Sequence, residues 1–123
     1  MASRNLDIGF IGIGVLGRGL SLALAERGYR VAGAHSRSEA SARWLADRIP
    51  GCDVYASAQA LSDVSGLVFI TTPDSAIEEV TRSVNWRYGQ GVVHCCGGAS
   101  IELLKSAAQQ GAMTGAFHPF QTF

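Results

Sequence analysis

Short apolar segments alternate with longer segments of helical periodicity along the whole chain. The apolar runs predict six strands, at residues 6–11, 29–36, 52–56, 66–72, 91–95 and 112–117. Apolar residues at helical spacing predict helices at 15–28, 38–49, 73–84 and 100–110, with a weaker helical turn at 58–61. This alternation predicts an α/β fold with a doubly wound, mostly parallel six-stranded sheet in the order 3-2-1-4-5-6.

Capping residues mark where the predicted helices begin and end. Ser38 and Ser100 are expected to cap the second and last helices. Thr72 is expected to cap the helix after the fourth strand, with Pro73 at its first position. Gly28 and Gly111 are expected to end the helices that precede them.

The composition is that of a one-domain globular protein. The 123 residues suffice for one domain, and 47% hydrophobic with 16% charged residues describes an ordinary globular protein. Ten basic residues balance ten acidic ones and form no basic stripe, so we expect no nucleic-acid partner. No apolar run is long enough to cross a bilayer, so we expect no membrane partner.

The chain's expected location follows from its cysteines and its amino terminus. The first residues lack the long apolar stretch and cleavage site of a signal peptide. The three cysteines (Cys52, Cys95 and Cys96) are odd in number and lack metal-ligand spacing, so no metal site is expected. Together these features predict reduced thiols and a cytoplasmic protein.

A glycine-rich loop, FIGIGVLGRG, joins the first predicted strand to the first helix. Gly12 would permit the tight turn, Gly14 would let a diphosphate approach the backbone, and Gly17 would let the helix lie close to the sheet. The unpaired amides of Val15, Leu16 and Gly17 would then hold the anion. The alternative is a structural turn in a domain without a ligand.

The end of the second strand bears on which dinucleotide would bind. An NAD site typically has a carboxylate about 20 residues beyond the glycines. Here the sequence is His-Ser-Arg-Ser, where Arg37 could bind a 2′-phosphate and the hydroxyls of Ser36 and Ser38 could donate to it. These residues favour NADP over NAD. The alternative is a solvated arginine beside a helix cap.

Four segments together resemble consecutive landmarks of one bacterial family. They are GFIGIGVLGRGLSLALAERGYRVAGAHSRS, VFITTPDSAI, VVHCCGGAS and GAFHPFQTF. The family consists of Rossmann-like NAD(P)-binding oxidoreductases with a C-terminal helical domain, within the 6-phosphogluconate-dehydrogenase-like superfamily. The resemblance spans Ile8 to Phe123 but only the N-terminal half of a usual member. It therefore implies a single NAD(P)-binding Rossmann domain over residues 1–123, without the substrate and dimerisation domain of relatives.

The resemblance also implies roles for individual residues. Thr71, Thr72 and Pro73 would line the cofactor after the fourth strand. The final His-Pro-Phe resembles a segment of prephenate dehydrogenases whose histidine contacts the reacting hydroxyl, which makes His118 the catalytic candidate. One departure concerns the end of the fifth strand, which in the family tends to be His-x-Ser-Gly-Ala. Cys96 here replaces its hydroxyl, and this weakens any role assigned to that position.

Several other residues have a structural and a functional interpretation. His118 could move a proton or only end a strand, whereas His94 fits better as a strand end that bonds the backbone. Cys95 and Cys96 would point to opposite faces, so at least one is expected in the core. Trp44 and Trp86 are expected to pack rather than to bind ligand.

Two functional hypotheses follow. The first is the NADP-binding part of an oxidoreductase that transfers a hydride to or from a small polar substrate. The second is a non-catalytic nucleotide-binding module acting through a partner. Under either hypothesis, the last predicted strand would need to be covered by a partner. That partner would be a second copy in a homodimer or a separate C-terminal partner domain.

Overall fold

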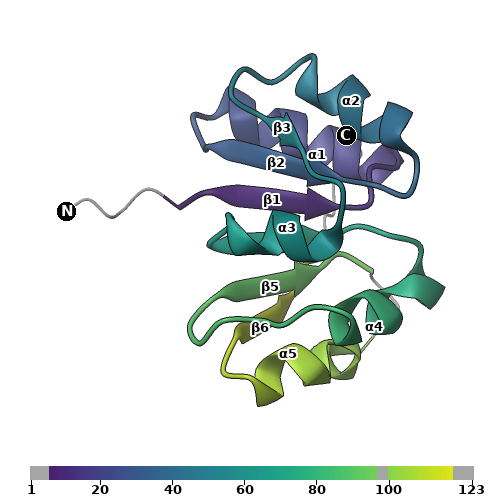
Figure 1. Ribbon diagram of the computed structural model, residues 1–123, viewed down its shortest axis with the longest axis vertical. Coiled ribbons are helices and arrows are strands. Elements are labelled where there is room, and N and C mark those ends of the chain that lie inside the picture. Colours follow the sequence, from purple (N-terminus) through teal and green to yellow (C-terminus); the bar gives the residue numbers. More distant parts are fainter. Residues whose placement is uncertain (1–5, 97–99, 118–123) are drawn as a thin grey trace.

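The computed structural model describes residues 6–96 and 100–117 (Figure 1). In chain order the elements are β1 (Ile8–Ile11), α1 (Val15–Glu26), β2 (Val31–His35), α2 (Glu39–Ala46), β3 (Asp53–Val54), α3 (Ala58–Asp63), β4 (Leu67–Ile70), α4 (Asp74–Arg82), β5 (Gly91–His94), the 3-10 helix η2 (Ile101–Leu104), α5 (Lys105–Gln109) and β6 (Met113–Ala116). All strands are parallel, in the order β3-β2-β1-β4-β5-β6. The predicted fold and strand order are confirmed.

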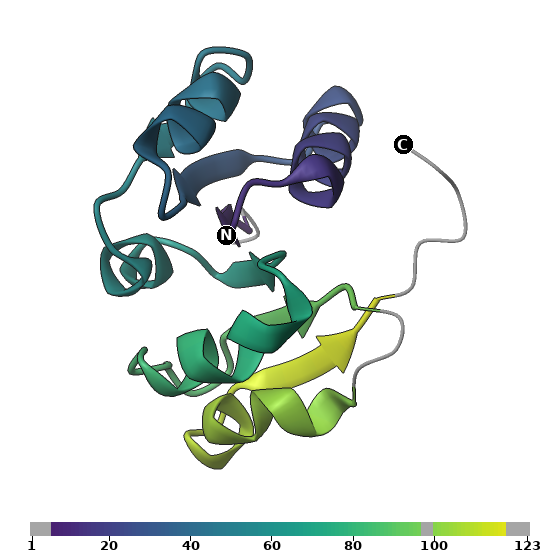
Figure 2. The ribbon, with the colours of Figure 1, turned by 90° about the vertical axis from the view of Figure 1, so that its right-hand side faces the viewer.

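Two hydrophobic clusters lie on the two faces of the sheet. Ile8 and Phe10 of β1 share one cluster with Leu20 of α1 and Leu45 of α2. The other cluster gathers Ile11 with residues of α3, α4 and α5, which lie on the opposite side (Figure 2). Alternate β1 residues therefore serve opposite clusters, as expected for a strand buried on both faces.

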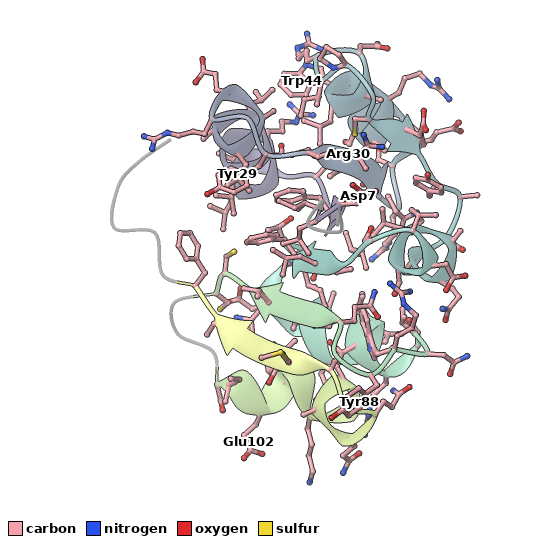
Figure 3. All side chains as sticks on the ribbon, turned by 90° about the vertical axis from the view of Figure 1, so that its left-hand side faces the viewer. Asp7, Tyr29, Arg30, Trp44, Tyr88 and Glu102 are labelled. Carbon is pink, nitrogen blue, oxygen red and sulfur yellow. The ribbon has the colours of Figure 1, made fainter. Side chains whose placement is uncertain are left out.

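The two faces are not equally covered. Parallel register aligns Leu67, Gly91 and Met113 on the α1 face of the sheet, in line with Ile8. Among the described elements, α1 and α2 pack on one face of the sheet, over its β2 and β3 side, whereas the helices that contact β6 are η2 and α5 on the opposite face (Figure 2). Met113 is consequently 71% exposed, and Tyr29, which lies between α1 and β2 (Figure 3), is 57% exposed.

Most predicted caps are confirmed. The Ser38 and Ser100 hydroxyl oxygens accept from the amides of Ser41 and Glu102, and Gly28 and Gly111 have φ of +93° and +94°. The cap of α4 was predicted wrongly: Pro73, with ψ of 150°, is the N-cap, and the helix begins at Asp74. The extended ψ of Pro73 is that of a flanking residue, and its carbonyl accepts from the Ala76 amide over 2.9 Å, as the carbonyl of an N-cap residue does.

The last predicted helix is also divided into two. Residues 101–104 form the 3-10 helix η2, which is followed by the α-helix α5. The tighter turn carries Leu104 into the core, where its side chain is fully buried. In the part of the chain that is described, no helix has the length and apolar character needed to cross a membrane.

Candidate dinucleotide site

A cleft of about 1040 Å³ lies at the carboxyl ends of the strands, where β1 and β4 adjoin and the strand order reverses. Its walls are residues 11–16, 35–37, 56–58 and 70–74, with Ala76, Glu79, Val80 and Ser83 of α4 and Cys95 and Cys96 after β5. The residues predicted to bind cofactor all line this cleft except Gly17 and Ser38. A ligand at this position is the general expectation for a doubly wound sheet.

Gly12 makes the turn out of β1. Its φ of +91° lies in the left-handed region, and a Cβ there would come within 2.7 Å of the Thr72 amide nitrogen. The Gly12 amide donates to the His35 carbonyl over 2.8 Å, and the Thr71 hydroxyl donates to the Gly12 carbonyl. The loop is therefore tied to both neighbouring strands.

Gly14 lies at the open floor of the cleft, directly before α1. No atom lies within 4 Å of the position that a Cβ on Gly14 would occupy. The first backbone hydrogen bond of α1 joins the Arg18 amide to the Gly14 carbonyl, so the amides of Val15, Leu16 and Gly17 have no partner within the helix. The first turn of α1 contains no acidic residue, so its positive dipole end is not offset there.

Gly17 lies behind the loop and is buried against the sheet. A Cβ at this position would lie 2.7 Å from Thr71 Oγ1 and 2.8 Å from the Gly12 carbonyl oxygen. Such distances are far below ordinary van der Waals contact. Gly17 therefore permits α1 to lie close to β4, as predicted.

The end of β2 presents Arg37 to solvent. The ion pairs among the described residues join Arg30 to Asp7 and Arg43 to Glu39, and neither involves Arg37. The Ser36 hydroxyl oxygen accepts from the Ser38 amide over 3.2 Å. Ser38 is the cap of α2 and does not line the cleft.

Two neighbouring threonines after β4 have different surroundings. The Thr71 hydroxyl is already bonded to the Gly12 carbonyl. Thr72 Oγ1 is buried in the cleft wall and has no hydrogen-bond partner among the residues described. A buried hydroxyl without a partner is energetically unfavourable, so Thr72 is the residue of this pair that a polar ligand would satisfy.

His94 is fully buried at the end of β5 and bonds the backbone through both ring nitrogens. Nδ1 accepts from the Cys96 amide over 3.2 Å, so the neutral ring carries its proton on Nε2, which donates to the Ser100 carbonyl over 3.0 Å. The structural interpretation of His94 is confirmed. His118, the catalytic candidate, lies outside the described residues.

The two tryptophans have the packing roles that were expected. Trp86 is 5% exposed and donates its indole N–H to the Thr81 carbonyl over 2.9 Å. Trp44 of α2 packs against the core, and the guanidinium groups of Arg18 and Arg48 lie 4.4 and 3.9 Å from its ring centroid (Figure 3). Neither residue lines the cleft.

Cys95 is buried, and burial raises the pKa of its thiol from 9.0 to about 11. The pKa of Cys52 is raised to about 11 as well, chiefly by burial and further by the negative charge of Asp53. Both thiols are therefore protonated near neutral pH, which is the inert state.

These raised pKa values predict a loss of stability at alkaline pH. The folded protein holds these thiol protons more tightly than the unfolded chain, so the free energy of unfolding falls as pH rises from about 9 to 11, on the order of 1 kcal/mol for each thiol. The free energy of unfolding, measured with urea between pH 8 and 11, should fall less steeply with pH for Cys95→Ala than for the wild type. Equal pH dependence in the two proteins would contradict a raised pKa for the Cys95 thiol.

Some cleft residues were not predicted from the sequence. His35 ends β2, and Ala56 and Ser57 follow β3; their position at the carboxyl edge of the sheet was the signal that could have identified them. Glu79, Val80 and Ser83 come from the middle and end of α4, where nothing in the sequence distinguishes the helix face toward the cleft.

Comparison with known proteins agrees with this geometry. The model of one family, described as a Rossmann-like domain, matches residues 1–119. The curated proteins include no match. Among solved structures, a protein described as an NADP oxidoreductase from Bacteroides fragilis is 28% identical, with a TM-score of 0.80, over 97% of this chain and 45% of that chain.

Two further solved structures share the fold at lower identity. A reductive aminase from Aspergillus terreus, in complex with NADPH and ethyl levulinate, is 19% identical with a TM-score of 0.81, over 96% of this chain and 42% of that one. The 3-hydroxyisobutyrate dehydrogenase of Mycobacterium tuberculosis is 19% identical with a TM-score of 0.76, over 89% and 38%. The chain thus spans less than half the length of these structures.

Proposed function

Because the chain belongs to the Rossmann-like domain family, we propose that it is the NADP-binding part of an oxidoreductase that transfers a hydride to or from a small polar substrate. The observation that carries this proposal is the open floor at Gly14, bordered by the unpaired amides at the start of α1. The Bacteroides fragilis protein, described as an NADP oxidoreductase, supports the choice of cofactor.

The surroundings of the cleft fit the chemical groups of NADP. The amides of Val15 and Leu16 would donate to the diphosphate, at the positive end of a helix with no acid in its first turn. The Arg37 guanidinium would bind the 2′-phosphate together with the hydroxyl of Ser36, whereas Ser38, which was also expected to contribute, caps α2 outside the cleft. Gly17 would keep α1 near enough to the sheet for this arrangement.

The other end of the cleft would hold the reactive part of the cofactor. Bound NADP supplies the hydride acceptor or donor, and the chain has to orient it and exclude water. Thr71, Thr72 and Pro73 would line this end, where buried Thr72 Oγ1 has no hydrogen-bond partner among the described residues. His118 would carry the proton that accompanies the hydride.

The exposed apolar side chains of the described part of β6 and the residue after it indicate where a partner would bind. Met113 and Phe117 are 71% and 41% exposed, beside the partly buried Val93 and Phe69 on the α1 face. We infer that a separate C-terminal domain covers this surface and completes the substrate pocket, with a second copy of the chain as the alternative occupant.

The cytoplasmic location expected from the sequence stays a prediction.

The Arg37 assignment predicts a change in cofactor preference. In titrations followed by nicotinamide fluorescence, Arg37→Met is expected to weaken NADPH binding by about 10- to 100-fold, because one charge-assisted contact to a dianion is lost. NADH binding should be unchanged, since NADH has no 2′-phosphate.

Arg27→Met is the matched control, because Arg27 is an exposed arginine at the other end of α1. A wild-type preference for NADH would contradict the role of Arg37. If the wild type binds neither dinucleotide, the proposed function itself is wrong.

A further inference from the structure

A second, smaller hollow of about 320 Å³ opens beside the main cleft. It shares residues 35–37 and Ala56 with that cleft and extends over the first turns of α2, with Glu39, Arg43, Val54 and Tyr55 as its other walls. Two guanidinium groups, those of Arg37 and Arg43, therefore border one hollow of a size suited to a small anion. Sequence reasoning drew attention to Arg37 alone.

Arg43 is held toward this hollow by a weak ion pair. Its Nη2 donates to Glu39 Oε2 over 3.0 Å, and both side chains are largely exposed, at 60% for Arg43 and 75% for Glu39. Exposed pairs four residues apart on a helix contribute little to stability. The Glu39 carboxylate therefore positions Arg43 near the hollow without holding it strongly.

His35 is another residue of the wall of this hollow. Its Nδ1 donates to the Tyr55 carbonyl over 2.9 Å, which ties the end of β2 to the residue that follows β3. This bond joins the two sides of the hollow, so the hollow is part of the folded framework.

The charges around the hollow fit a phosphate monoester better than a ribose diol. Arg37 and Arg43 contribute two positive charges and Glu39 one negative charge. Without Arg43, the Glu39 carboxylate would face a phosphate dianion and repel it. A dinucleotide without the 2′-phosphate places no charge here and leaves the Glu39–Arg43 pair as it is.

From this arrangement we infer that Arg43 is a second specificity-determining residue for the 2′-phosphate, which exchanges its bond to Glu39 for a bond to the phosphoryl oxygens. The inference rests on the proposed NADP function and adds a residue and a switch of partner to it. Because Arg43 would act only when the 2′-phosphate is present, it would set the preference between the two dinucleotides and leave their shared contacts unaffected.

Calorimetric titration of the whole chain tests this with two probes that differ only in the relevant group, adenosine 2′,5′-bisphosphate and AMP. The wild type is expected to prefer the bisphosphate. Arg43→Met should weaken bisphosphate binding by about tenfold, as for loss of one charge-assisted contact at an exposed site, and leave AMP binding unchanged. Unchanged AMP binding also verifies that the variant is folded.

The Glu39→Gln background separates direct contact from mere neutralisation of Glu39. If Arg43 contacts the phosphate, Arg43→Met still weakens bisphosphate binding in the Glu39→Gln background. If that substitution has no effect there, Arg43 only neutralises Glu39, and the inference is overturned.

The remaining outcomes separate this inference from the proposed function. If Arg37→Met abolishes the preference for the bisphosphate while Arg43→Met leaves it intact, only the role of Arg43 is overturned. If wild-type protein binds neither probe nor NADPH, both the role of Arg43 and the proposed function are overturned. Arg27→Met again provides the control for removing an exposed arginine.

Discussion

Gly14→Val is expected to weaken NADPH binding at least a hundredfold, to the limit of detection, while the protein stays folded. The backbone at Gly14 has φ of −94° and ψ of −161°, which any residue adopts, and apart from Gly14 and its two chain neighbours no atom lies within 4 Å of a Cβ there. The valine side chain would occupy the open floor of the cleft instead. An anion could then no longer approach the amides of Val15 and Leu16.

The stability of this variant is the decisive second measurement. Gly14 is the N-cap of α1, and valine is a poorer cap than glycine, so a loss of about 1 kcal/mol in the free energy of unfolding is expected. Urea unfolding and nicotinamide fluorescence would be measured on the same preparation. Gly14→Ala should show a smaller loss of binding, in proportion to the smaller side chain.

The control is a glycine elsewhere with comparable space around it. Gly115 of β6 lies outside the cleft, and a Cβ there would lie 3.8 Å from the nearest atom, in Val93. Gly115→Ala should bind NADPH as the wild type does. Normal binding by Gly14→Val would mean that the diphosphate does not lie at the start of α1.

The fold was predictable because its signals are local. The central strands β1, β4 and β5 are short, mostly apolar runs, and right-handed crossovers between parallel strands leave few possible orders for six strands. The boundaries were less predictable. Thr72 was expected to cap α4, but its side chain is turned into the cleft wall and the helix begins two residues later.

The part of the site formed by the backbone could be predicted from the sequence, whereas the part formed by side chains was harder to predict. Gly12 has a positive φ, and a Cβ on Gly12 or Gly17 would come too close to neighbouring atoms. A Cβ on Gly14 would instead project into the open space of the cleft. Arg43, in contrast, looks in the sequence like one more exposed residue of an amphipathic helix. Only the fold reveals that it shares a hollow with Arg37.

The substrate cannot be predicted from this sequence, for a related reason. Cofactor contacts come from strand ends whose order the topology determines, whereas a substrate pocket depends on side chains that cover the cleft from outside. In this chain the strand that would support such a cover, β6, has Met113 and the adjoining Phe117 exposed. We therefore expect substrate selectivity to be determined by whatever covers these residues.

Gly17→Val is expected to act first on stability, whereas Gly14→Val acts first on binding. A Cβ at Gly17 would lie 2.7 Å from Thr71 Oγ1 and 2.8 Å from the Gly12 carbonyl oxygen, so α1 has to move away from β4. Overpacking of this kind in a closely packed interior costs about 1–3 kcal/mol, and the bond between Thr71 and Gly12 would be strained as well. The urea midpoint should fall markedly, and binding should be lost together with the fold.

A double variant tests whether the contact with Thr71 is the cause. Thr71→Ala removes the hydroxyl that a Cβ at position 17 would meet, so Gly17→Ala should cost less stability in the Thr71→Ala background than in the wild type. The contact with the Gly12 carbonyl would persist, so the rescue is expected to be partial. Should Gly17→Ala alone be as stable as the wild type, α1 does not depend on this close approach. In that case Gly14, at the N-cap, and Gly17, within α1, would not divide their roles between the ligand and the fold.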